Sequence, residues 1–157
     1  MSDRTISHVA FELERVYPAT PERVFAAFAA VSAKAGWLTF PNDWQLTEHT
    51  LDFRVGGHER IHTGPAQGPQ HGYEAVYHDI VVNSRIVLSY EVRIDETLLS
   101  VSLATIELWP EGDRTHLILH DSGVFLDGHE DPRWREQGAN DALDALGTLL
   151  DNPAVGA

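Results

Sequence analysis

The sequence predicts an α+β protein in which one antiparallel sheet packs against a long C-terminal helix. Three observations predict this fold: an amphipathic segment near the C-terminus, seven segments with strand-like composition, and helices that occur in blocks. Strands that alternated with helices would instead indicate a parallel sheet. We expect the whole chain, 1–157, to form a single domain, because a chain of this length can bury a core of its own.

The segment 131–151 is predicted to be the long C-terminal helix. Its apolar residues recur three and four positions apart and therefore share one face: Ala139, Ala142, Leu143, Leu146 and Leu150. Asp131-Pro132 is typical of a helix start, and Asn152-Pro153 of a helix end. Gly138 and Gly147 each cost about 1 kcal/mol relative to alanine inside a helix. We therefore expect that each glycine allows close packing, causes a kink or leaves space beside the helix.

The N-terminal part predicts a strand at 8–17 followed by two short helices within 21–36. Val9, Phe11 and Leu13 alternate with other residues along the strand, and Pro18 closes it. Thr20-Pro21 is typical of a helix N-cap and first turn. Residues 37–44 are aromatic and rich in turn-forming residues, which predicts a loop over apolar surface that could act as a lid.

Six further strands are predicted between 46 and 121, most of them separated by turn-forming residues. Their ranges are 46–55, 57–63, 72–81, 85–94, 98–109 and 115–121. Even-numbered residues from Ile86 to Val92 are expected to face the core. The apolar parity changes between Leu103 and Ile106, which predicts a bulge or a strand covered on both faces. Residues 123–131 are predicted to be a loop. A sheet with this many strands should twist and curl, and a curled sheet around a helix encloses space.

Composition excludes several classes of function. The chain has 24 acidic and 11 basic residues, and its net charge of −13 repels nucleic acid and anionic lipid surfaces. It contains no apolar run long enough to span a membrane, and its first residues lack a signal-peptide core. We therefore expect a cytoplasmic protein with no nucleic-acid or membrane partner.

The chain contains no cysteine, so only imidazole and carboxylate groups remain as plausible metal ligands. His58 and His62 share one strand face, as do His116 and His120, and these pairs could in principle meet across strands. Both faces are predicted to be outer ones. We therefore expect neither a metal site nor a cofactor.

Several short motifs, taken in their order along the chain, resemble the START-like (SRPBCC) superfamily. Within it they are similar to the "activator of heat-shock protein 90 ATPase homologue-like" branch, which is also called polyketide-cyclase-like. The resemblance covers nearly the whole chain. The motifs are Pro21-Glu22-Arg23-Val24-Phe25, Gly36-Trp37, Asp52-Phe53-Arg54-Val55-Gly56-Gly57, Gly112-Asp113-Arg114-Thr115 and the helix with Gly138, Leu143 and Leu146. The segments 57–60, 100–105 and 125–128 are similar to one stand-alone bacterial subgroup of this branch.

The resemblance implies a helix-grip fold, in which seven curved antiparallel strands surround the C-terminal helix and leave an apolar cavity. It does not imply one chemistry, because the superfamily includes lipid carriers, cyclases and co-chaperone domains. One position departs from the family: Ala139 stands where many members have tryptophan. Its small side chain either widens the cavity or leaves the packing to Trp134.

Glu59 is the candidate for a polar or catalytic role. Alternation places it on the same strand face as Ile61 and Thr63, which is expected to look into the cavity. A carboxylate buried there would have a raised pKa and could act as a general acid or base, or orient a ligand. Alternatively, Glu59 lies at the mouth of the cavity and pairs with Arg54 or Arg60.

Aromatic and apolar residues complete the predicted ligand site. Tyr73, Tyr77 and Tyr90 offer hydroxyl groups on apolar rings, and they could equally be ordinary core residues. Trp37 and Trp44 could belong to a lid or simply pack between helices and sheet. The full predicted site consists of Trp37, Trp44, Glu59, Ile61, Tyr73, Tyr77, Tyr90, Phe125, Leu143 and Leu146.

Three functions are consistent with these features. The first is a protein that binds a small hydrophobic or aromatic ligand between the sheet and the terminal helix. The second is a cyclase- or hydrolase-like enzyme that uses Glu59 and a cavity tyrosine as acid and base. The third is a protein-binding module with a chaperone partner, which we place last because the chain lacks the extra N-terminal domain expected of a full chaperone activator.

Overall fold

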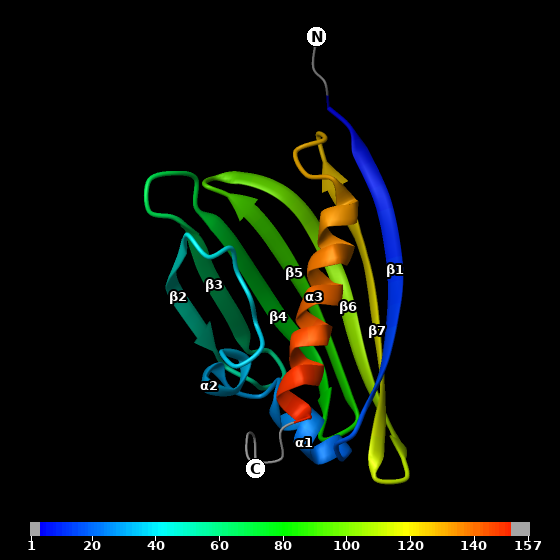
Figure 1. Ribbon diagram of the computed structural model, residues 1–157. Helices are drawn as coiled ribbons and strands as arrows, with labels where there is room; N and C mark the ends of the chain where they lie inside the picture. The colour runs from blue at the N-terminus through cyan, green and yellow to red at the C-terminus, as the bar shows by residue number, and fades with distance from the viewer. Residues whose placement is uncertain (1–3, 152–157) are drawn as a thin grey trace.

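The computed structural model describes residues 4–151 and shows one antiparallel sheet that curves around a long helix (Figure 1). The elements in chain order are β1 Ile6–Tyr17, α1 Pro21–Ala26, α2 Val31–Lys34, β2 Trp44–Leu51, β3 His58–Pro65, β4 His71–Val81, β5 Arg85–Ile94, β6 Thr97–Glu111, β7 Arg114–Leu126 and α3 Pro132–Leu150. The sheet has 7 strands in the order β1-β7-β6-β5-β4-β3-β2. The predicted α+β helix-grip architecture is confirmed.

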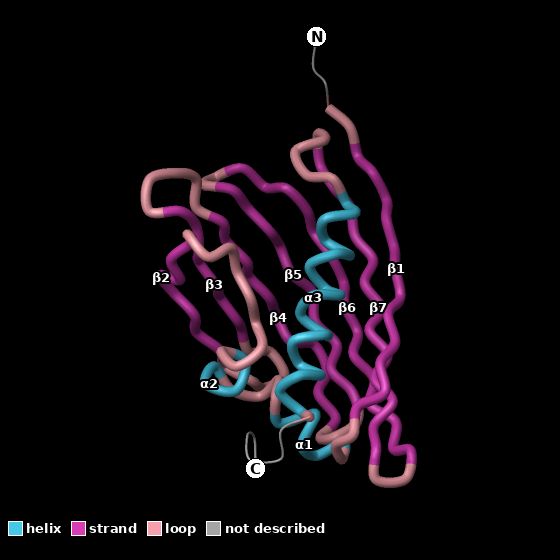
Figure 2. Tube along the Cα trace, in the orientation of Figure 1, coloured by secondary structure: helices cyan, strands magenta, loops and turns pink. Residues whose placement is uncertain are grey.

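Helix α3 lies on the inner face of the curved sheet, beside β1 (Figure 2). It begins where the sequence predicts, because the Asp131 carboxylate accepts a hydrogen bond from the Arg133 backbone N–H at 3.0 Å, and Pro132 occupies the first turn. Leu143, Leu146 and Leu150 form its fully buried stripe. The predicted stop at 152–153 lies outside the described residues.

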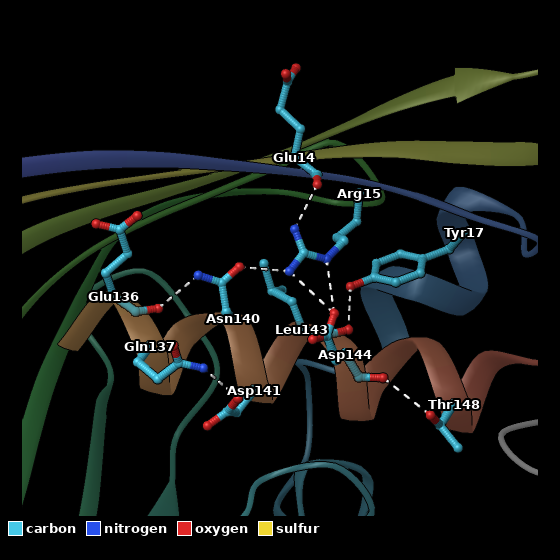
Figure 3. A network of polar contacts seen from close by, with 10 residues as sticks. All are labelled: Glu14, Arg15, Tyr17, Glu136, Gln137, Asn140, Asp141, Leu143, Asp144 and Thr148. Carbon is cyan, nitrogen blue, oxygen red and sulfur yellow. Dashed lines mark hydrogen bonds and ion pairs between the residues drawn. The ribbon is translucent and has the colours of Figure 1, made fainter. Parts of the chain in front are cut away.

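Polar contacts fix α3 to β1, an edge strand of the sheet (Figure 3). The Tyr17 hydroxyl donates to the Leu143 carbonyl oxygen at 2.7 Å, inside the core. Arg15 donates from Nε to the Asp144 carboxylate at 3.2 Å and from Nη2 to the Asn140 side-chain oxygen at 2.8 Å. These bonds set the position of the helix over the β1 side of the sheet.

The two glycines of α3 have different surroundings. A Cβ atom at Gly147 would lie 3.2 Å from a ring carbon of Tyr17, so this glycine permits close packing of helix and strand. A Cβ atom at Gly138 would meet no atom within 4 Å. Gly138 therefore borders open space, whereas Gly147 belongs to the packed end of the helix.

Several predicted boundaries were wrong. The strand predicted at 46–55 spans Trp44–Leu51, because the chain turns immediately afterwards and the Gly57 N–H donates to the Arg54 carbonyl at 2.8 Å. Trp44 therefore begins β2 and does not lie in the preceding loop. The loop predicted at 123–131 starts later, because β7 extends to Leu126, where it pairs with the first residues of β1.

The parity change in β6 also has a different explanation from the predicted ones. The register against β5 is continuous across residues 100–107, so no bulge separates Leu103 from Ile106. Val101 and Leu103 instead point outward and are partly exposed, at 39% and 46%. The register shift lies earlier, at Leu99, where β6 has one residue more than β5.

Replacing each α3 glycine by alanine should give opposite results. Gly138→Ala is expected to raise the free energy of unfolding by about 0.5–1 kcal/mol, because the helix gains propensity and nothing is displaced. Gly147→Ala is expected to gain less or to destabilise, because its methyl group must displace Tyr17. Urea unfolding of both variants tests this, and an equal gain at the two positions would contradict the assigned packing.

Candidate functional site

A pocket of about 680 Å³ lies between the inner face of the sheet, α2 with the loop that follows it, and the first half of α3. Its walls come mainly from apolar and aromatic side chains of β3 to β7. The loop between α2 and β2 passes in front of the sheet (Figure 2), and its residues Leu38, Thr39, Phe40 and Pro41 line the pocket. The loop predicted to lie over apolar surface therefore forms part of the pocket wall.

Most of the predicted site residues meet at this pocket. Those that line it are Trp37, Trp44, Glu59, Ile61, Tyr73, Tyr77, Tyr90 and Leu143. Phe125 and Leu146 do not line it, which corrects the prediction for these two positions. Leu146 belongs to the fully buried stripe of α3. The centre of the Phe125 ring lies 4.9 Å from Cζ of the Arg135 guanidinium.

The face of α3 that borders the pocket is made of small residues. Gly138, Ala139 and Ala142 line the pocket there. Trp134 lines the pocket but has not taken over the packing beside Ala139, because it is 68% exposed. Ala139 therefore leaves space in this chain.

Glu59 is buried, with 1% of its surface exposed, and it is the centre of a hydrogen-bond network. Its Oε1 accepts from Lys34 Nζ at 2.7 Å and from the Tyr77 hydroxyl at 2.8 Å. Its Oε2 lies 2.8 Å from His49 Nε2, which must carry the proton because an ionised carboxylate only accepts. Elements α2, β2, β3 and β4 thus each contribute one member of the network.

The predicted rise in the pKa of Glu59 was wrong. Burial by itself raises this pKa, but the Lys34 ammonium and the hydrogen bonds from Lys34, His49 and Tyr77 together outweigh it. The net effect holds the pKa below its ordinary value, so Glu59 is ionised at neutral pH. The same burial and the adjacent carboxylate raise the pKa of Tyr77, which keeps its proton.

The alternative partners predicted for Glu59 were also wrong. Arg54 pairs with Asp52 at 2.8 Å, and Arg60 pairs with Glu74 at 3.0 Å, both on the surface. Lys34 takes their place as the partner, and it is the only lysine among the 157 residues. The Lys34 side chain is only 10% exposed, so the one lysine ammonium group of the chain is held in this buried ion pair.

Sequence reasoning missed both Lys34 and His49. From Leu46, simple alternation places His49 on the outer face of β2. The register of β2 against β3 shifts between Leu46 and Glu48, so Thr47 is an extra residue and His49 turns inward opposite Ile61. For Lys34, the only signal in the sequence was that it is a unique lysine in an acidic chain.

A second polar cluster lies at the pocket beside the start of α3. The Tyr90 hydroxyl donates to the buried carboxylate of Asp121. Arg135 donates to the Tyr90 oxygen at 3.3 Å, to Ser100 Oγ at 2.9 Å and to the Glu130 carboxylate at 3.0 Å. Burial raises the pKa of Asp121 against the lowering effects of Tyr90 and Arg135, and burial raises the pKa of Tyr90 to about 12.

Tyr73 lies between the two clusters. Its ring centre is 5.1 Å from that of Tyr90, and burial together with the charges of Glu59 and Asp121 raises the pKa of its hydroxyl well above the ordinary value. Among residues 4–151 this hydroxyl has no hydrogen-bond partner, unlike those of Tyr77 and Tyr90. The surrounding protein does not completely enclose the Tyr73 hydroxyl oxygen, so the oxygen keeps some accessible surface.

Within the part of the chain that the structure describes, no three His, Asp or Glu side chains gather closely enough to hold a metal ion. No helix of that part is both long enough and apolar enough to cross a membrane.

The curved sheet, the terminal helix and the pocket between them define a START-like helix-grip protein. Residues 18–151 match the family described as "Activator of Hsp90 ATPase homolog 1-like protein". The chain belongs to this family, and the resemblance stated from its sequence motifs is confirmed.

Solved structures of bacterial proteins are similar along nearly the whole chain. An uncharacterised protein from Rhizobium leguminosarum is 38% identical with a TM-score of 0.87, and the match covers 94% of this chain and 97% of that one. A protein from Rhizobium loti is 38% identical with a TM-score of 0.85, covering 92% and 98%. A protein from Chromobacterium violaceum is 30% identical with a TM-score of 0.74, covering 91% and 97%. No curated protein matches the chain.

Breaking the buried pair from either side should destabilise the fold. Glu59→Gln and Lys34→Met are each expected to lower the free energy of unfolding by about 3 kcal/mol, because each leaves a buried charge without its partner. The double variant should lose clearly less than the sum. Chemical denaturation measures all three, with Glu74→Gln in the exposed Arg60 pair as the control, expected to change stability by less than about 1 kcal/mol. Additive losses would exclude direct coupling of Lys34 and Glu59.

The contribution of Glu59 to stability should depend on pH with a defined sign. Its pKa is lowered on folding, so its stabilisation is complete above the ordinary value of 4.5 and is lost as the pH falls through the lower folded value. The stability difference between wild type and Glu59→Gln should therefore be constant near neutral pH and shrink in acid. Denaturation curves across this range test it, and a difference that grows in acid would mean that the folded pKa is raised.

Proposed function

We propose that this protein binds a small apolar or aromatic molecule in the pocket between its sheet and α3. The observation that carries the proposal is the pocket itself, about 680 Å³ in volume with mainly apolar walls. Ligand pockets in proteins span roughly 300–1,000 Å³ and combine apolar walls with few polar groups. The volume therefore suits a molecule of a few fused or linked rings, or an acyl chain of similar size.

The small residues of α3 support this proposal. Packing alone would favour large side chains at Gly138, Ala139 and Ala142, because a void without an occupant forfeits dispersion contacts. An apolar ligand would supply those contacts. Trp44 and Trp134 also line the pocket, and their rings offer flat apolar surfaces to such a molecule.

The surroundings of Glu59 favour binding over acid–base catalysis by this residue. Its carboxylate is ionised and already accepts bonds from Lys34, His49 and Tyr77. A general acid needs a pKa raised toward neutral pH, and that of Glu59 is shifted in the other direction. Glu59 is better suited to holding the pocket wall together.

A neutral hydrophobic fluorophore provides a direct test. N-phenyl-1-naphthylamine should gain fluorescence when mixed with the folded protein, because the dye leaves water for an apolar pocket. Ala139→Trp should weaken its binding by about tenfold or more, because the indole fills the space that Ala139 leaves beside α3.

The matched control is Asp141→Trp, which adds the same indole to the exposed face of α3. It should leave the affinity for the dye unchanged within about twofold. Circular dichroism establishes that both variants are folded. If wild type fails to bind the dye, or if both tryptophan variants bind it as wild type does, the pocket is not the binding site.

A further inference from the structure

Every charged side chain at the pocket already has a partner within the protein. Lys34 pairs with Glu59, and Arg135 pairs with Glu130. The remaining carboxylate, Asp121, accepts the hydroxyl of Tyr90. Both cations at the pocket are thus ion-paired, so a ligand with a carboxylate group would find no free counter-charge there and would lose its hydration in an apolar site.

Tyr73 differs from these paired groups. It lines the pocket, and its hydroxyl has no hydrogen-bond partner among residues 4–151. The hydroxyl keeps its proton, because burial and the nearby carboxylates of Glu59 and Asp121 raise its pKa well above the ordinary range. Among the described residues, the Tyr73 O–H is thus a pocket donor without a protein acceptor, and a ligand that displaced solvent from it without offering an acceptor would leave it costly and unpaired.

We propose that the pocket selects neutral ligands over anionic ones and favours those that carry a hydrogen-bond acceptor, such as a carbonyl or ester oxygen, and that Tyr73 donates to this acceptor. This inference rests on the proposed binding function and defines its ligand class. The apolar rings or chain of the ligand lie against the walls, and the acceptor oxygen points toward β4, between the clusters of Glu59 and Asp121.

Three naphthalene compounds of similar size separate the contributions. Methyl 2-naphthoate is neutral and carries an acceptor, 2-isopropylnaphthalene is neutral without one, and 2-naphthoate is an anion. Their affinities are measured by displacement of N-phenyl-1-naphthylamine at neutral pH, on wild type and on Tyr73→Phe. Tyr73→Phe should weaken the methyl ester about fivefold, the value of one hydrogen bond, and leave the hydrocarbon unchanged within about twofold.

Tyr17→Phe is the control variant. Its hydroxyl bonds to the Leu143 carbonyl oxygen and the residue does not line the pocket, so this variant should lower thermal stability without changing the ratio of the two affinities. In wild type the anion should bind about tenfold more weakly than the methyl ester or worse. Anion binding as tight as that of the ester would overturn the selection for neutral ligands.

The outcomes distinguish this inference from the proposed function. If the dye and the naphthalenes bind but Tyr73→Phe leaves the ratio of ester to hydrocarbon unchanged, the pocket is a binding site and the role of Tyr73 is wrong. If Tyr73→Phe weakens ester and hydrocarbon equally, its effect is on pocket shape, and the donor role is again wrong. If neither the dye nor any naphthalene binds wild type, the proposed function fails and this inference fails with it.

Discussion

The attachment of α3 to one edge of the sheet is the constraint on which the rest of the structure depends. Tyr17 and Arg15 bind the helix to β1, and Gly147 lets the helix and Tyr17 approach closely. One helix, roughly 10 Å wide with its side chains, covers only part of a sheet whose strands lie about 4.8 Å apart. The curved strands on the β2 side therefore face α3 across a space, which the small residues of the helix enlarge.

The wall of the pocket opposite α3 depends on a buried carboxylate. Glu59 joins α2, β2, β3 and β4 through Lys34, His49 and Tyr77, so the short α2 is bound to the sheet by an ion pair as well as by packing. Lys34 and Glu59 neutralise each other, and Arg135 pairs with Glu130, so within residues 4–151 no cation that lines the pocket lacks a carboxylate partner. Under the proposed binding function, the same pairing that stabilises this wall would disfavour an anionic ligand.

Strand alternation was sufficient to predict much of the site. Glu59, Ile61 and Thr63 all face inward, as expected for residues that share one side of a strand. It failed for His49, because the extra residue Thr47 reverses the alternation of β2, and a bulge of this kind leaves no regular pattern in one sequence. The prediction for Phe125 failed for another reason: it was expected in a loop at the pocket, whereas it lies in β7, packs against Arg135 and does not line the pocket.

The sequence by itself determined the α+β class, the positions of the main elements, the inward face of β3 and the membership of the family, because these follow from local periodicity and short motifs. Only the tertiary structure decided that Lys34 is the partner of Glu59, that the pKa of Glu59 falls on folding, and that the Tyr73 hydroxyl has no hydrogen-bond partner among residues 4–151. The reason is physical: pKa shifts and hydrogen-bond partners depend on groups brought together from distant parts of the chain, and periodicity carries no information about those distances.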